Sequence, residues 1–222
     1  FVNIAKEKPK GTKFDWEIVC EISKAMGYEM NYSNTSEIAD EISSLTPSYA
    51  GISHERIKKV GIQWPCPDKN HPGTVFLHKD GNFKRANGRG LFSAIEYKPP
   101  RELPDENYPF ILTTGRILYH YHSRSETKRV KVLNNFVPKN YMEINPVDAD
   151  KLNVKDKETV KVTSRRGSIE VESKISDRPK KGVVFISFHF KESAANVLTN
   201  PVLDPIAKIP EFKVAAVRIE KT

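Results

Sequence analysis

The stretch Ile111–Arg124 carries the residues whose types and spacing are best suited to binding chemistry. It begins with an apolar run, passes through two threonines and a glycine, and continues with the cationic or titratable side chains of Arg116, His120, His122 and Arg124. A strand would fix the position of the stretch, the glycine would let a ligand approach the backbone, and the donors would face phosphate or a polarised ring. The pattern therefore predicts a site for an anionic, planar ligand. A strand that runs into a solvated loop is an alternative of equal weight.

The elements that must position this stretch lie in the second half of the chain. Residues 145–152 predict one or two helical turns with Pro146 at their start, and Arg165–Gly167 predicts a hairpin turn with solvated arginines. Short runs of strand character lie at 110–112, 141–144, 158–163, 168–175, 182–186 and 214–219. About six short strands in about 115 residues predict a small closed barrel rather than a parallel sheet.

The first half has a different pattern. Apolar residues recur at helical spacing over 12–26, 36–45 and, more weakly, 49–59. A region rich in Pro and Gly follows, and short strands are predicted at 75–78 and 90–95. A proline-rich linker at roughly 98–107 then gives the clearest boundary. We therefore expect a smaller α/β segment over 1–100 and a barrel domain over 107–222.

Composition narrows the classes of function. The chain has 222 residues and a formal net charge of +8, which allows an acidic partner or an anionic cofactor. The basic residues are spread along the chain without zinc spacing or a nucleic-acid-binding motif, so we expect no nucleic acid partner. No apolar run approaches the roughly 20 residues that a transmembrane helix needs. Cys20 and Cys66 lie far apart in the sequence and have no metal-site spacing, so we expect no metal-ligating residue. Nothing in the sequence indicates an oxidising compartment, so we expect a cytoplasmic protein.

Residues 108–222 resemble the molybdopterin dinucleotide-binding domain that ends the large subunit of molybdenum and tungsten oxidoreductases. Several short segments carry the resemblance, in the order that the family has them. These are Leu112–Arg116 with His120 and His122, then Glu143–Ala149, Val162–Gly167, Ala195–Thr199, Leu203–Pro205 and Pro210–Lys213. The resemblance implies a six-stranded double-psi β-barrel, so the expected fold is mainly β with α.

The first half resembles the formate dehydrogenase catalytic (alpha) subunit more than nitrate or dimethyl sulfoxide reductases. The segments that carry this narrower resemblance are Asp15–Ile18, Met26–Tyr28, Ile42–Pro47, Gln63–Pro67 and His71–Thr74. The resemblance implies that the chain is the C-terminal third of such a subunit and that residues 1–100 are the tail of the preceding domain. The cysteines for an iron–sulfur cluster, the metal ligand and the catalytic residues would all lie upstream, so no catalytic or metal-ligating residue is expected here.

The same resemblance implies which residues contact the cofactor. The expected contacts are Thr114, Gly115, Arg116, His120, His122, Phe188, Asn196, Phe212 and Lys213. The planar fork of Arg116 would pair with phosphate or pterin atoms, and the Asn196 amide would bind a polar ring edge in both directions. A solvated loop is the alternative for His122, and a surface lysine is the alternative for Lys213.

The implied function is to hold bis-molybdopterin guanine dinucleotide, with Mo or W, in an enzyme that oxidises formate to CO2. A 4Fe-4S cluster would lie in the missing N-terminal part. The implied partners are the rest of the catalytic subunit and an electron-transfer subunit that carries iron–sulfur clusters and handles NAD or a deazaflavin. Two alternatives remain: another molybdopterin oxidoreductase, or a basic β-barrel interaction module without cofactor. The module predicts no pterin and binding that weakens steeply with salt.

Overall fold

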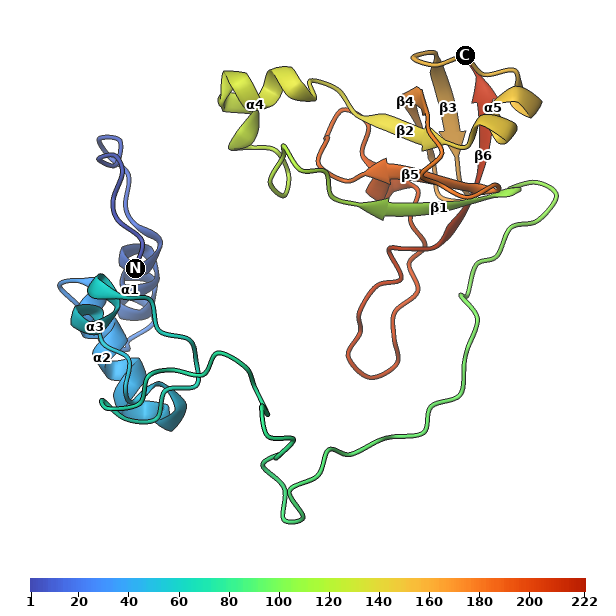
Figure 1. Cartoon of the computed structure of the whole chain (residues 1–222). Coiled ribbons are helices and arrows are strands. Elements are labelled where there is room, and N and C mark those ends of the chain that lie inside the picture. Colours follow the sequence, from blue (N-terminus) through green and yellow to red (C-terminus); the bar gives the residue numbers. More distant parts are fainter. The chain divides into compact units, whose positions relative to one another are not determined.

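The computed structural model describes residues 1–222, and these form two compact units, Phe1–Ala94 and Ile95–Thr222. The second unit is a closed six-stranded barrel (Figure 1), which confirms the predicted fold class. The strands, in the order in which neighbours pair around the barrel, are β1 (Phe110–Gly115), β5 (Val183–Ser187), β2 (Tyr141–Ile144), β4 (Ser168–Ile175), β3 (Thr159–Thr163) and β6 (Ala215–Lys221). Closure leaves no free sheet edge.

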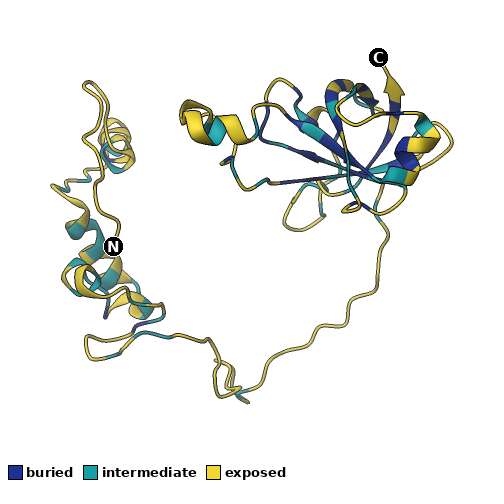
Figure 2. Cartoon of the chain, turned by 45° about the horizontal axis from the view of Figure 1, so that its top comes forward, coloured by how far each residue is buried: buried dark blue, intermediate teal, exposed yellow.

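Buried and exposed residues alternate along the strands, and the buried ones form the core of the barrel. In β3, for example, Val160 and Val162 are buried while the residues between and beside them are more exposed. Side chains of alternate residues point to opposite faces of a strand, so each strand contributes one face to the interior. The most completely buried of these side chains are Leu112, Met142, Ile144, Val160, Val162, Val184, Ile186 and Val217. Figure 2 shows the buried residues concentrated along these strands.

Strand direction decides which loops share one end of the barrel. β1 and β5 are parallel, and β2 and β6 run antiparallel to β5 and β1 respectively. The last residues of β1 and β5 and the first residues of β2 and β6 therefore lie at the same end, which we call the loop end. Two long loops, residues 116–140 and 188–214, leave from it. The first holds η2 (Thr127–Arg129) and α4 (Lys131–Phe136), and the second holds η3 (Ala195–Val197).

The opposite end of the barrel carries α5 (Pro146–Leu152), which confirms the helical turns predicted from Pro146. The side chain of Asn145 caps this helix by accepting from the N–H of Val147. The buried Asp148 carboxylate accepts from the N–H of Gly182 at 2.6 Å, which joins the helix to the start of β5. The predicted cofactor contacts all lie at the loop end, on the other side of the barrel from this helix.

The hairpin between β3 and β4 is confirmed, but the prediction that both of its arginines are solvated is wrong. The Ser164 N–H donates to the Gly167 carbonyl at 2.8 Å, as a tight turn requires. Arg166 binds Glu102 through both terminal nitrogens and also donates to the Leu198 carbonyl at 2.7 Å. Arg165 lies 3.1 Å from the same carboxylate. Glu102 lies in the segment expected to be a free linker, and no local pattern indicates so distant a partner.

Glu102 fixes the segment before β1 to the barrel. Its carboxylate also accepts from the Ala216 N–H of β6 at 2.7 Å. Burial disfavours ionisation of this group. The hydrogen bonds from Arg166 and Ala216 and the charges of Arg166 and Arg165 outweigh that effect and lower the pKa of Glu102 below its ordinary value. We call Glu102, Arg165 and Arg166 the strap.

The first unit contains the three predicted helices, α1 (Asp15–Ala25), α2 (Thr35–Leu45) and α3 (His54–Lys59), together with the short turn η1 (Pro47–Tyr49). The strands predicted at 75–78 and 90–95 are wrong, because those residues form turns or irregular chain. A strand needs a neighbour to take up its backbone hydrogen bonds, and neither segment has one. No helix of the chain has both the length and the apolar character that crossing a bilayer requires.

A polar corner holds the first unit together. The Arg56 guanidinium donates to the carbonyls of Gly51 and His71 and lies 3.5 Å from the sulfur of Cys66. The Cys66 N–H donates to the Ser48 carbonyl at 2.7 Å, and the thiol is completely buried. The Pro- and Gly-rich sequence around Cys66 is thus an ordered corner fixed by the half-buried Arg56.

Candidate functional site

The first strand ends at Gly115, where the absence of a side chain has a packing reason. A Cβ built on Gly115 would lie 2.7 Å from a ring carbon of Phe185 and 3.8 Å from the Lys213 ammonium. Gly115 and Phe185 come from neighbouring parallel strands, so the ring fills the space beside the glycine. The glycine therefore allows Phe185 to cover the end of β1, and the predicted contact of Gly115 with the cofactor stays a prediction.

Thr114 and Lys213 join the end of β1 to the second long loop. The Thr114 hydroxyl donates to the Phe212 carbonyl at 2.8 Å, and the Lys213 ammonium donates to the Thr114 carbonyl at 2.5 Å. Residues almost a hundred positions apart in the sequence, which were predicted to share a site, thus lie side by side. Thr114 is buried, while Phe212 and Lys213 are exposed, so the two later residues are accessible to a ligand.

Arg116 follows the glycine and is exposed. Its guanidinium lies over the ring of Phe188, with 5.2 Å between the guanidinium carbon and the ring centroid. None of the chain's ion pairs includes Arg116. A guanidinium carries donors in a fixed planar fork that suits phosphate and planar heterocycles. Arg116 is thus a cation without an ion-pair partner, held at the end of a strand and able to donate hydrogen bonds to an anion.

The two histidines of the first loop differ in environment. His120 is buried, and both of its ring nitrogens have partners within the chain: Thr127 Oγ1 at 3.0 Å and the Val137 carbonyl at 2.7 Å. His122 is exposed, and its backbone φ of 42° lies in the left-handed region. The His120 ring therefore organises the loop, while the His122 ring is free to meet a ligand. Both predicted contacts stay predictions.

The predicted contact Asn196 lies in η3 and is exposed. Two other asparagines, which the sequence pattern did not single out, are buried. Asn140 donates to the carbonyls of Ser187 and Ser193, and Asn200 donates to the Val214 carbonyl at 2.6 Å. These amides fasten the second loop to the barrel, so they hold the site in shape and leave Asn196 available.

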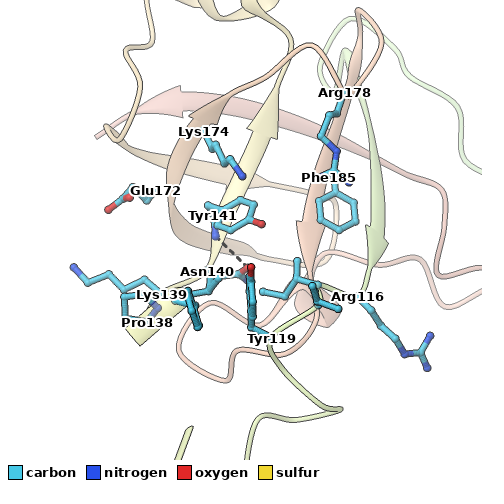
Figure 3. Close-up of a pocket in the computed structure, with 14 residues that line it drawn as sticks. Arg116, Tyr119, Pro138, Lys139, Asn140, Tyr141, Glu172, Lys174, Arg178 and Phe185 are labelled. Carbon is cyan, nitrogen blue, oxygen red and sulfur yellow. Dashed lines mark hydrogen bonds between the residues drawn. The ribbon is translucent and has the colours of Figure 1, made fainter. Parts of the chain in front are cut away.

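A cavity of about 760 Å³ lies between the first loop and the outside of strands β2, β4 and β5. Arg116 is the only predicted contact that lines it. Figure 3 shows Tyr141, Lys174 and Phe185 facing this space, with the guanidinium of Arg116 directed away from them. The cavity also has three cations that sequence reasoning missed, Lys139, Lys174 and Arg178. Strand alternation could have indicated Lys174, which lies on the outer face of β4.

Charge in and around this cavity is positive on balance. Lys174 and Arg178 lie 3.4 and 3.3 Å from the buried carboxylate of Glu143, and Lys174 also lies over the Tyr141 ring. Lys139 has no ion-pair partner, and Arg116 has none either. Four cations, with Arg116 at the edge, thus lie in or beside the cavity together with two carboxylates, Glu143 and Glu172. A space of this size with a positive rim and aromatic walls suits a large anion that contains a flat ring.

The second unit matches the family model described as "Molydopterin dinucleotide binding domain" over residues 110–216. The barrel belongs to this family. The match spans all of the two long loops, so every predicted contact of the dinucleotide-binding barrel lies within it.

Similar proteins match both units of the chain. The alpha subunit of F420-dependent formate dehydrogenase from Methanocaldococcus jannaschii is 49% identical over 209 residues, which are 93% of this chain and 31% of that protein. The assimilatory nitrate reductase catalytic subunit of Bacillus subtilis is 38% identical over 95% of this chain and 31% of that protein. The chain thus spans about a third of the length of these relatives.

Solved structures share the fold, and one of them is an enzyme of a different name. Acetylene hydratase from Pelobacter acetylenicus matches 97% of this chain and 34% of its own length, with a TM-score of 0.70 and 16% sequence identity. At that identity the likeness concerns the fold alone.

Proposed function

We propose that the chain is the cofactor-holding part of a formate dehydrogenase catalytic subunit, in which the barrel binds molybdopterin guanine dinucleotide of a Mo or W site. One observation carries the proposal: within a barrel of the dinucleotide-binding family, Arg116 is exposed, lies over the Phe188 ring and has no ion-pair partner at the loop end. The identity of 49% to an F420-dependent formate dehydrogenase favours formate over nitrate, for which the relative is 38% identical.

The donor set fits such a group. A pterin dinucleotide carries a pyrophosphate and flat heterocycles with mixed donors and acceptors. The loop end offers a free guanidinium on Arg116, an exposed imidazole on His122, an exposed amide on Asn196 and an exposed ring on Phe212. Each of these types binds phosphate, a polar ring edge or a ring face. The fit supports binding of the organic part of the cofactor and does not involve a metal ligand.

When bound, the cofactor supplies the redox chemistry through its metal, and the protein supplies placement and electrostatics. In this proposal Arg116 and the cavity cations neutralise phosphate charge. Thr114 and Lys213 hold the second loop against the end of β1, and the Phe188 ring lies against the planar guanidinium of Arg116. The residues of this chain would therefore orient and bury the cofactor, while substrate contacts would come from the rest of the subunit.

The proposal extends to the electron acceptor and the partners. We infer a deazaflavin-linked enzyme, because the formate dehydrogenase relative with 49% identity is described as F420-dependent. Electrons would then leave through a 4Fe-4S cluster upstream in the subunit and a separate electron-transfer subunit. The enzyme would work in the cytoplasm. Reduction of F420 by formate, measured beside reduction of NAD, tests this inference directly.

The decisive experiment uses the full-length parent subunit. Pterin released by oxidation is quantified per polypeptide for the wild type, Arg116→Ala and Arg116→Lys. Charge-assisted hydrogen bonds stabilise by about 1.5–3 kcal/mol, so we expect Arg116→Ala to weaken cofactor retention about ten-fold or more. Arg116→Lys should restore little, since an ammonium lacks the planar fork.

Arg129→Ala is the matched control, because Arg129 is an exposed arginine of the same loop and has no ion pair. It should retain wild-type pterin. A parent protein without pterin would contradict the proposal, and so would normal pterin content and formate turnover in Arg116→Ala.

Nitrate reduction is the second candidate function, favoured by the 38% identity to an assimilatory nitrate reductase over most of the chain. The same purified protein decides between the two. We expect formate-dependent reduction of a viologen dye, and we expect no oxidation of reduced viologen by nitrate. The opposite pattern would leave the cofactor site in place and replace formate by nitrate.

A further inference from the structure

His189 is a completely buried titratable side chain at the loop end, with only 1% of its surface exposed. It lies two residues beyond β5. The Phe188 N–H donates to the Gly115 carbonyl at 3.2 Å, which continues the pairing of β5 with β1 beyond the last strand residue. This register places His189 beside the first residues of the loop that follows β1.

The imidazole of His189 bridges two backbone groups of that loop. Its Nε2 accepts from the Ile117 N–H at 3.0 Å, and its Nδ1 lies 2.5 Å from the His122 carbonyl. A backbone N–H can only donate and a carbonyl can only accept. The ring must therefore carry its proton on Nδ1 and keep Nε2 bare, which is one of the two neutral tautomers.

The loop that His189 holds does not adopt its backbone conformation freely. His122 has φ of 42° and Arg124 has φ of 63°, both in the left-handed region that side chains other than glycine rarely enter. Such conformations persist when surrounding contacts impose them. His189 supplies one contact to His122, and Arg124 is held by the Phe190 ring at 4.4 Å and by the Pro138 carbonyl.

Together these contacts point to a role that is distinct from ligand contact. We propose that His189 is a positioning residue. Its hydrogen bonds to Ile117 and His122, which we call the bolt, attach the first loop to the end of β5 and so hold Arg116 and His122 in place to contact the cofactor. The role in cofactor binding rests on the proposed function. The bolt itself is a property of the chain.

The bolt has a built-in sensitivity to acid. A second proton on Nε2 would face the Ile117 N–H, so the protonated ring would lose one of its two bonds. Burial lowers the pKa of His189, the bond to the His122 carbonyl opposes this, and the charges of His120, Arg116 and His122 lower it further. Glu192, the nearest acidic residue in sequence, pairs with Arg124 at 3.8 Å. The bolt is therefore intact at neutral pH and opens on acidification.

The test measures amide hydrogen exchange by mass spectrometry over residues 116–124 of the full-length parent protein. The variants are His189→Ala, which removes the bolt, and His189→Gln, whose amide can accept from Ile117 and donate to His122 without titrating. His78→Gln, at an exposed histidine of the first unit, is the control. Exchange rates are corrected for the intrinsic effect of pH.

We expect protection of the loop amides to fall at least ten-fold in His189→Ala at neutral pH and to stay at the wild-type level in His189→Gln. In the wild type protection should fall as the solution is acidified, while in His189→Gln it should be flat. Equal protection in the wild type and His189→Ala would overturn the bolt. Should His189→Ala fail to fold, the same acid-dependent loss in wild type and His189→Gln would overturn it.

Pterin content separates this inference from the proposed function. Loss of both protection and pterin in His189→Ala supports the whole proposal. A parent protein that holds no pterin but shows the expected protection pattern keeps the bolt and overturns its link to the cofactor. Retention of pterin in His189→Ala despite lost protection overturns the same link, while Arg116→Ala still tests the proposed function.

Discussion

The two units of the chain use their apolar residues in opposite ways. The barrel encloses an interior of aliphatic side chains from all six strands, with many of them completely buried. In the first unit the buried apolar side chains are only Cys20 and Cys66. Its helices leave large apolar residues exposed, among them Ile18, Val19, Ile22, Ile42 and Leu45. Figure 2 shows the contrast.

An amphipathic pattern therefore predicts which side of a helix or strand is apolar, and it does not predict that this side is buried in a core. A sheet closed on itself encloses what its inward face carries, since no edge remains. Three short helices have no such closure, and the first unit relies on the polar corner around Arg56. The barrel should therefore respond strongly to loss of apolar volume, while the first unit should respond to disruption of its corner.

The sharpest test of this comparison is one substitution made in both units. Leu112→Ala removes a completely buried side chain from the barrel core and should destabilise the barrel by about 2–5 kcal/mol. Leu45→Ala removes the same atoms from a side chain that is 73% exposed and should change stability by about 0.5 kcal/mol or less. Hydrogen exchange of strand and helix amides in urea resolves each unit. Similar losses in the two variants would contradict the comparison.

The polar corner should be the vulnerable point of the first unit. A Cβ at Gly51 would lie 2.0 Å from the Asp68 carbonyl oxygen and 2.7 Å from the Cys66 sulfur. Because the first of these is backbone, we expect Gly51→Ala to destabilise the unit by about 1–3 kcal/mol. Gly61→Ala, where a Cβ would meet nothing within 4 Å, is the control and should be neutral or slightly stabilising. Exchange protection of α2 and α3 reports both, and tolerance of Gly51→Ala would show that the corner is loose.

Removing the charge of Glu102 from the strap should have a smaller effect on the stability of the barrel. Glu102→Gln keeps the shape of the side chain and removes the charge that faces Arg166 and Arg165, so we expect a loss of about 1.5–3 kcal/mol. Glu220→Gln breaks the exposed pair with Arg218, at 3.2 Å, and should cost about 0.5 kcal/mol or less. Urea unfolding of the barrel measures both. Equal effects would mean that the strap is an ordinary surface pair.

The strap also predicts a dependence on pH, which should be the smallest effect. The pKa of Glu102 is lowered in the folded chain from the ordinary 4.5. The unfolded chain therefore binds the extra proton first, and the stabilisation by Glu102 is present above pH 4.5 and is lost as the pH falls through the lowered folded pKa. The stability difference between wild type and Glu102→Gln should shrink in that acidic window. A difference that stays constant with pH would argue against an ionised strap.

Much of the barrel was predictable because strand periodicity is local. The six strands, the hairpin at Arg165–Gly167 and the turns from Pro146 were all predicted near their observed positions. The strands predicted at 75–78 and 90–95 failed because strand propensity is realised only beside a partner strand. The strap was missed because Glu102 and Arg166 are far apart in sequence and each, alone, resembles a surface charge.

The candidate site divides in the same way. The residue types near Leu112–Arg116 and, through resemblance, the family of the barrel could be inferred before the fold was known. The fold was needed to show that Arg116 has no ion-pair partner, that both ring nitrogens of His120 form hydrogen bonds, and that buried His189 bridges the loop. The alternation that indicates a strand is visible in neighbouring residues of the sequence. Burial, tautomer and ion pairing depend on residues that only the closed barrel brings together.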